Sequence, residues 1–75
     1  MTIAEAVSRD SEVMSGELCF AGTRVPVENL FGYLQGGASV ADFLLDFPGV
    51  TKEQIETVLN ASFAELNRFK PRKSA

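Results

Sequence analysis

The sequence predicts a mainly α fold, with a short N-terminal β-hairpin followed by three helices that form a helix-turn-helix domain. The first observation behind this prediction is the stretch Gly36–Leu59, where two amphipathic segments flank a Pro-Gly pair. The second is residues 17–27, a glycine-containing segment with several β-branched residues. Two short helices joined by a turn that contains glycine are typical of the helix-turn-helix motif.

Capping residues mark the starts of the two helices in this stretch. Ser39 and Thr51 are predicted N-caps, and each is followed three residues later by a side chain that can complete a capping box. Pro48 ends the first helix, because the residue before a proline is pushed out of the α region. Gly49 permits the positive φ that a sharp turn often needs. The predicted helices are therefore residues 39–47 and 51–69.

The remaining helix is predicted over Val27–Gln35, where apolar residues recur at helical spacing. Gly36–Gly37 should end it, with one glycine at the C′ position. In the last and longest helix, the same spacing predicts an inward-facing stripe. Its members are Ile55, Val58, Leu59, Ser62, Phe63 and Leu66.

The β part is predicted as a hairpin between Leu18–Phe20 and Val25–Val27, with Pro26 on an edge because it has no N–H to donate. Residues 1–10 are predicted to form a short helical turn or a frayed N-terminal segment. A lone hairpin is marginal in water, so this one should pack on the helices or pair with a second chain. The predicted homodimer interface consists of Leu18, Phe20, Val25 and Val27.

The length of the chain limits the number of its domains, and its charge distribution indicates what it binds. Its 75 residues allow one domain, predicted over residues 1–70, with a mobile basic tail at 71–75. Hydrophobic residues make up 45% of the chain, a surplus that favours a dimer or a permanent partner. Residues 1–67 carry three basic and ten acidic side chains, whereas residues 68–75 carry a charge of +4. This imbalance indicates a protein partner or a phosphate contact by the tail.

The composition also argues against catalysis. The chain has no histidine, the commonest general base, and its single cysteine, Cys19, lies in an apolar run typical of a buried residue. No metal-ligand spacing and no phosphate-binding loop occur, so no cofactor or metal is predicted. The N-terminus lacks a signal-peptide pattern and no run of 18 apolar residues occurs, so a cytoplasmic protein without a membrane span is expected.

Three sets of residues are candidates for contacts with other molecules. In a helix-turn-helix the second helix offers its exposed N-terminal residues to DNA, here Lys52, Thr57 and Asn60. Glu53 and Glu56 on the same helix would repel phosphates, so a scaffold that binds no DNA is the favoured alternative. Tyr33 and Leu45 fall off the main helical stripes and are candidate interface residues or peripheral core. The basic end is a candidate toxin-binding or phosphate-binding segment, or only a solubilising tail: Arg68, Lys70, Arg72 and Lys73.

The order of several short motifs resembles the domain-of-unknown-function family 433. The residues that carry the resemblance are Leu18–Phe20, Gly22–Val27, Gly36–Ser39 and Phe47–Thr51, and the similarity covers about residues 7–64. Phe47 stands where the family has a tyrosine, and the basic tail lies beyond the domain. The resemblance implies a homeodomain-like helix-turn-helix after a small β element, and commonly a homodimer.

Members of that family look like antitoxins encoded beside a toxin with a PIN-like nuclease fold, which implies a bacterial or archaeal cytoplasmic protein. The first hypothesis is therefore an antitoxin of a type II pair that binds and neutralises a PIN-like ribonuclease and represses its own operon by binding operator DNA. Two alternatives stay open: a DNA-binding regulator without a toxin, and a structural interaction module without a nucleic-acid role. The resemblance also implies that arginines of the tail, Arg68 and Arg72, enter the toxin's acidic metal site.

Overall fold

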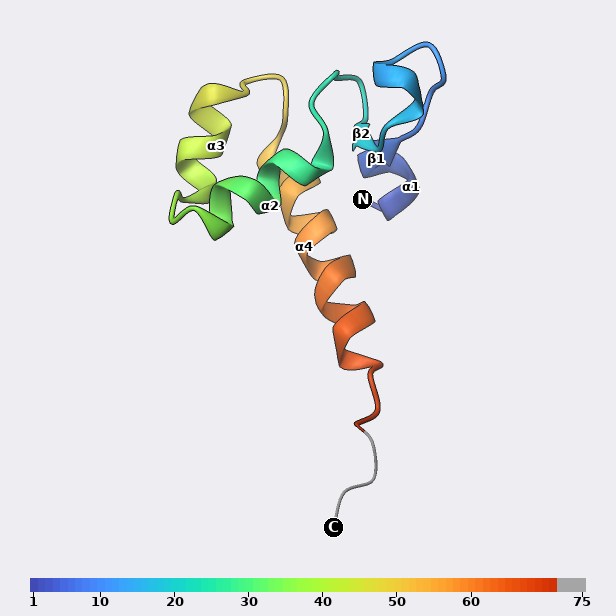
Figure 1. Ribbon diagram of the computed structural model, residues 1–75, viewed down its shortest axis with the longest axis vertical. Coiled ribbons are helices and arrows are strands. Elements are labelled where there is room, and N and C mark those ends of the chain that lie inside the picture. The colour runs from blue at the N-terminus through green and yellow to red at the C-terminus, as the bar shows by residue number, and fades with distance from the viewer. Residues whose placement is uncertain (72–75) are drawn as a thin grey trace.

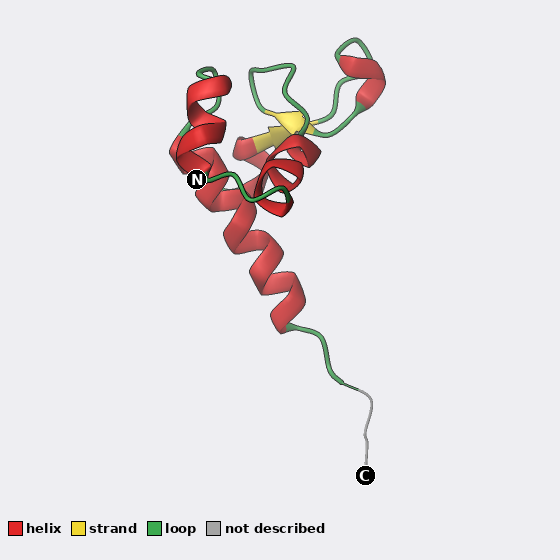
Figure 2. Cartoon of the chain, turned by 60° about the vertical axis from the view of Figure 1, so that its left-hand side comes forward, coloured by secondary structure: helices red, strands yellow, loops and turns green. Residues whose placement is uncertain are grey.

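The structure is a computed structural model that describes residues 1–71, and it has the predicted mainly α architecture (Figures 1 and 2). Most of the elements form a compact head, defined as residues 1–60, from which the end of the last helix projects as a stem, residues 61–71 (Figure 1). The elements are α1 (Ile3–Ala6), β1 (Val7–Ser8), β2 (Cys19–Phe20), α2 (Val27–Gln35), α3 (Val40–Asp46) and α4 (Lys52–Asn67).

The hairpin pairs β2 with β1, in an antiparallel register that sets Val7 opposite Phe20. This pairing differs from the predicted one, in which residues 18–20 paired with residues 25–27. The predicted contact survives as one bridge between Cys19 and Pro26, flanked by two backbone hydrogen bonds. It does not extend into a strand, because Pro26 has no N–H and α2 begins at Val27.

Both predicted N-caps of the helix pair are confirmed as complete capping boxes. The Ser39 side chain accepts from the backbone N–H of Asp42, and the Asp42 carboxylate accepts from the N–H of Ser39 at 2.9 Å. Thr51 and Gln54 make the same reciprocal pair at the start of α4. Gly49 does not take the positive φ predicted for it, so the turn between α3 and α4 does not depend on that glycine's freedom.

Helix α2 has the predicted bounds, and its C-terminal end shows why a glycine pair follows it. Gly37 takes φ +91° and its N–H donates to the carbonyl of Leu34, while the N–H of Ala38 donates to the carbonyl of Tyr33. These two bonds form a Schellman motif, which satisfies carbonyls that the helix leaves free. The motif reverses the chain so that α3 returns against α2.

The core sits where β2, α2, α3 and the first half of α4 meet. Phe43 of α3 is its centre, with ring centroids 6.0 Å from Phe20, 5.1 Å from Tyr33 and 4.8 Å from Phe47. Aromatic pairs at such distances contribute beyond the area they bury. The buried apolar residues are Ala6, Cys19, Phe20, Val27, Leu30, Phe43, Val50, Ile55 and Val58.

One polar side chain, Gln54, is buried in the head and joins three segments of it. Its carboxamide oxygen accepts from the backbone N–H of Thr51 at 2.9 Å. Its amide nitrogen donates to the carbonyls of Ala6 at 3.2 Å and Ala21 at 3.0 Å. Gln54, which completes the capping box of α4, therefore also links α1 and the turn after β2 to that helix.

The prediction for the last helix was right about its start and wrong about the burial of its second half. Phe63 and Leu66, predicted to face inward, are 67% and 73% exposed. The helical stripe continues past Val58, but the last turns of α4 project from the head without a neighbouring element (Figure 1). Periodicity identified the apolar face without showing how far the core extends.

Candidate functional site

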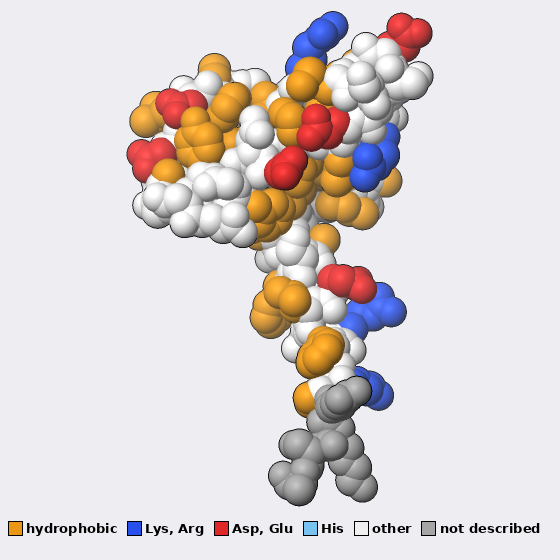
Figure 3. Space-filling model, viewed as in Figure 1, with side chains coloured by type: hydrophobic (Ala, Val, Ile, Leu, Met, Phe, Trp, Pro, Cys, Tyr) orange, Lys and Arg blue, Asp and Glu red, His pale blue; other side chains and the backbone are white. Residues whose placement is uncertain are grey.

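The stem is the part of the molecule that contributes no buried side chain to the core. From Phe63 to Pro71 every residue is exposed, although α4 is one continuous helix of 16 residues, about 24 Å long. Figure 3 shows orange hydrophobic side chains along the projecting part of the helix. Phe69, just beyond the helix end, is 72% exposed. Clustered large apolar side chains that stay exposed mark interaction sites more often than isolated ones do.

Basic residues lie at the tip of the stem. The Arg68 guanidinium forms an ion pair with Glu65 at 3.3 Å, and both side chains are more than 70% exposed. A surface pair of this kind contributes little to folding, so Arg68 can exchange Glu65 for another carboxylate at small cost. Lys70 is also exposed. Arg72 and Lys73, the other two residues predicted to bind a toxin, lie outside the described residues, as does most of the tail predicted to be mobile.

An open groove of about 370 Å³ runs along the base of the stem. One wall is a face of α4 with small residues, Ala61 and Ser62, at its centre, and the other walls come from α1, β1, α2 and the residue before β2. The lining is mostly apolar: Ile3, Val7, Leu18, Val27, Phe31, Val58, Ala61, Ser62 and Glu65. The sequence does not indicate this groove, because its walls come from segments up to 62 residues apart and no local pattern links them.

The predicted DNA-contact residues lie between the start and the middle of α4. Lys52 and Asn60 are exposed there, whereas the hydroxyl of Thr57 donates to the carbonyl of Glu53 at 2.8 Å. Glu53 and the similarly exposed Glu56 share this surface, and Glu53 pairs with the chain N-terminus at 3.4 Å. Lys52 and the N-terminal ammonium only balance the two glutamates, so this surface has no excess of positive charge to attract a phosphate backbone.

The four residues predicted to form a dimer interface are mostly used within the chain. Phe20 is completely buried and Val27 is 6% exposed, so neither offers surface to a second chain. Leu18 and Val25 are half-buried and pack against the core. Strand β1 pairs with β2 and so covers the strand that a second chain was predicted to cover.

The candidate interface residues Tyr33 and Leu45 differ in environment. Tyr33 is half-buried, packs edge-on against Phe43 and Phe47, and donates its hydroxyl to Asp46 at 2.6 Å. That hydrogen bond raises the pKa of the Tyr33 phenol, since the carboxylate stabilises its protonated form. Tyr33 therefore belongs to the contact between α2 and α3, whereas Leu45 is 80% exposed on the outer side of α3.

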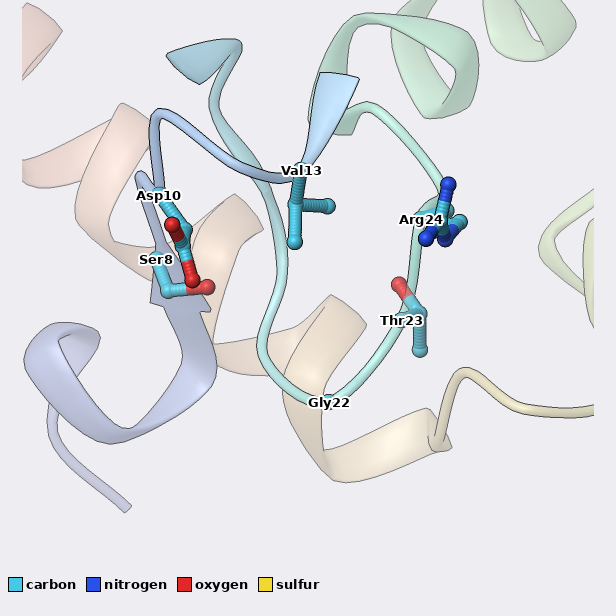
Figure 4. A pocket seen from close by; sticks show the side chains of 6 residues that line it. All are labelled: Ser8, Asp10, Val13, Gly22, Thr23 and Arg24. Atoms are coloured by element: carbon cyan, nitrogen blue, oxygen red, sulfur yellow. The ribbon is translucent and has the colours of Figure 1, made fainter. Parts of the chain in front are cut away.

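A second hollow, also of about 370 Å³ and lined by both polar and apolar residues, lies beside the turn after β2 (Figure 4). Ser8 and Asp10 lie on one side of it and Thr23 and Arg24 on the other (Figure 4). The Thr23 hydroxyl is occupied, because it donates to the carbonyl of Phe20 and accepts from the N–H of Val25. Thr23 therefore stabilises the turn after β2.

Cys19 is 1% exposed, as expected for a small buried hydrophobe rather than a reactive thiol. Within the described part of the chain, no cluster of three or more acidic or cysteine side chains is placed to hold a metal ion. None of the helices there combines the length and apolar composition needed to cross a bilayer. The stem and the groove at its base are therefore the candidate functional site.

No curated protein and no solved structure matches this chain. A family model described as a protein of unknown function, DUF433, matches residues 7–60. The match covers nearly the whole head and ends where the stem begins. It agrees with the resemblance drawn from the motifs at Gly22–Val27 and Phe47–Thr51. This chain belongs to the DUF433 family.

Proposed function

We propose that this protein is the antitoxin of a type II toxin–antitoxin pair and that it binds and neutralises a PIN-like ribonuclease. The observation that carries the proposal is the stem, a helical projection with exposed Phe63, Leu66 and Phe69 that ends in basic residues. Such a projection adds nothing to the core, but it suits insertion into a groove of another protein, where an apolar helix face supplies affinity.

The charge distribution supports a nuclease as the partner. A ribonuclease needs a positively charged surface for its substrate, and residues 1–67 of this chain carry a net charge of −7. A metal-dependent nuclease also presents carboxylates that hold Mg²⁺. Arg68 suits such a site better than a lysine would, because a guanidinium can bind a carboxylate through two parallel hydrogen bonds.

The test is to co-express this chain with the product of a neighbouring PIN-like gene, to isolate the complex, and to measure RNA cleavage. A variant with Arg68→Ala and without residues 71–75 should inhibit about 30-fold less well, the loss expected when one partner of a buried charge pair is removed. Arg24→Ala is the matched control, because Arg24 is exposed on the head far from the stem in sequence. Full inhibition by the truncated variant, or no complex at all, would count against the proposal.

Operator binding is the weaker part of the hypothesis. It is supported by the order of α3, a capped turn and α4, with Lys52 exposed at the start of the second helix and Asn60 exposed in its middle. The two glutamates on that surface oppose it. If the chain does bind its operator, Lys52→Ala should lower affinity and reduce the salt slope by about one unit. If neither nuclease nor DNA binds, a structural interaction module is the remaining candidate.

A further inference from the structure

We propose that the groove at the base of the stem is a second contact for the partner nuclease, and that it receives one large apolar side chain with a basic residue beside it. This inference rests on the proposed function and extends the contact from the stem to the head. The groove and the stem share α4, so a protein that encloses the stem down to the head also reaches the groove walls. The groove then selects which nuclease the stem can enter.

The lining of the groove selects an apolar occupant. Its least exposed members, Val27 and Val58, are 6% and 4% exposed, and Ile3 is 45% exposed. Ser62 offers no free donor, because its hydroxyl donates to the carbonyl of Val58 at 2.9 Å. A sugar or a nucleotide would therefore lose hydrogen bonds to water in this groove without replacing them. An apolar side chain instead gains free energy when it leaves water there.

The size of the groove suits a side chain better than a whole helix. Its volume of about 370 Å³ is near the lower end of the range of ligand pockets, which span ~300–1,000 Å³. The small side chain of Ala61 at the centre keeps this space open. A leucine or phenylalanine of the partner is an occupant of this kind. Single anchor side chains that fill such pockets carry much of the binding energy of protein interfaces.

The acidic group at the groove selects a basic neighbour for that anchor. Among the described residues that line the groove, Glu65 is the charged one, and it pairs with Arg68 at 3.3 Å on the exposed surface. In the proposed function Arg68 moves to a carboxylate of the nuclease. The Glu65 carboxylate is then released and can accept from a lysine or arginine of the same partner. One weak pair within the chain is thereby exchanged for two pairs between the chains, which favours binding.

Filling the groove tests the apolar part of the proposal. Ala61→Trp places a large ring at its centre and should raise the dissociation constant for the nuclease about 30-fold, the effect of losing an anchor contact. Ala41→Trp is the matched control, because Ala41 is an exposed alanine of α3 that does not line the groove, and affinity should stay unchanged. Circular dichroism should show both variants folded. Equal affinities of the two variants would overturn the proposal.

Two charge reversals test the basic neighbour. Glu65→Lys and Glu56→Lys change the net charge of α4 equally at exposed positions, but only Glu65 lines the groove. Any general attraction between the acidic chain and a basic nuclease therefore falls by the same amount in both variants. Glu65→Lys should weaken binding about tenfold more than Glu56→Lys, because it also places two cations in contact. Equal losses would contradict a basic side chain at the groove.

Thiol labelling shows whether the partner covers the groove, independently of RNA cleavage. Ile3→Cys places a thiol in the groove wall, while the native Cys19 is 1% exposed and protected from reagent. A bulky maleimide should label Ile3→Cys about tenfold more slowly in the complex than in the free chain, because anchor pockets are closed to solvent. Ala41→Cys should react equally fast in both. Equal rates for Ile3→Cys in the two states would show that the groove stays open.

The two proposals fail in different ways. If the wild-type chain neither binds nor inhibits the nuclease, the antitoxin function is wrong and the groove contact is wrong with it. If the wild-type chain inhibits and the Arg68→Ala truncation weakens inhibition, while Ile3→Cys stays fully reactive in the complex, only the groove contact is refuted.

Discussion

The two halves of α4 follow one apolar periodicity but have opposite environments. In the first half, Ile55 and Val58 are buried and Gln54 is bonded to two other segments. In the second half, Phe63 and Leu66 are about 70% exposed. The contrast shows that helical periodicity identifies an apolar face, whereas the neighbouring elements decide whether that face becomes core or binding surface. The family match, which ends at residue 60, divides the helix near the same point.

The strongest test of this contrast compares two phenylalanines. Phe43→Ala removes a completely buried ring and should lower the free energy of unfolding by about 4 kcal/mol, since it leaves a cavity at the centre of the head. Phe63→Ala should change it by less than about 0.5 kcal/mol. Urea unfolding of both variants measures the difference. Equal losses would mean that the stem packs on the head.

The next largest effect is expected at Gln54. Gln54→Glu keeps the acceptor of the capping box but replaces an amide donor with a carboxylate oxygen facing the carbonyls of Ala6 and Ala21. The free energy of unfolding should fall by about 3 kcal/mol, and the melting temperature by roughly 12–24 °C. Gln35→Glu makes the same change at an exposed position of α2 and is the control. A melting temperature as high as that of the control would show that the two carbonyls do not need this donor.

A smaller loss is expected when the start of α4 is uncapped. Thr51→Ala removes the hydroxyl that accepts from the N–H of Gln54 and should cost about 1 kcal/mol, or about 4–8 °C in melting temperature. Thr57→Ala, inside the same helix, should have a smaller effect because its hydroxyl bonds to a carbonyl that the helix already uses. Thermal unfolding of both variants compares them. An unchanged melting temperature for Thr51→Ala would mean that the helix starts at another residue.

The smallest effect concerns the carboxylates of the two other capping boxes. Hydrogen bonds to Thr2 and Ser39 lower the pKa of Glu5 and Asp42 below their ordinary values of 4.5 and 3.8. Their contribution to stability is thus present above these values and is lost as the pH falls through the lowered pKa of the folded state. The double variant Glu5→Gln, Asp42→Asn should lose less stability than the wild type on acidification from pH 7, measured by urea unfolding. An identical acid dependence would contradict this expectation.

Features set by a few adjacent residues were predictable from the sequence. The caps at Ser39 and Thr51, and the bounds of α2 at Val27–Gln35, depend on side chains within one or two turns, so the pattern alone identifies them. Strand β1 was not predictable, because two residues carry no periodicity. The donors of Gln54 reach carbonyls 48 and 33 residues away, which no local pattern can indicate.

The candidate site was predicted only in part. Its apolar and basic residues were noticed along the chain, but Phe63 and Leu66 were assigned to the core because their spacing matches that of Ile55. Whether they are covered depends on where the head ends, and that is decided by how α1, α2 and the hairpin pack together. The groove depends on the same packing and was therefore absent from the prediction.

The length of the stem also bears on the lifetime of the protein in a cell. Residues 61–67 form about two helical turns beyond the head, and exposed turns at the end of a helix open more readily than the part that is packed. In a chain without a partner, these turns should open often enough for a protease to cut them, while the head stays folded. A bound partner would hold these turns closed and so prevent cleavage. The amount of intact protein would then report how much of it is occupied, and a single cut would leave a stable but non-binding head.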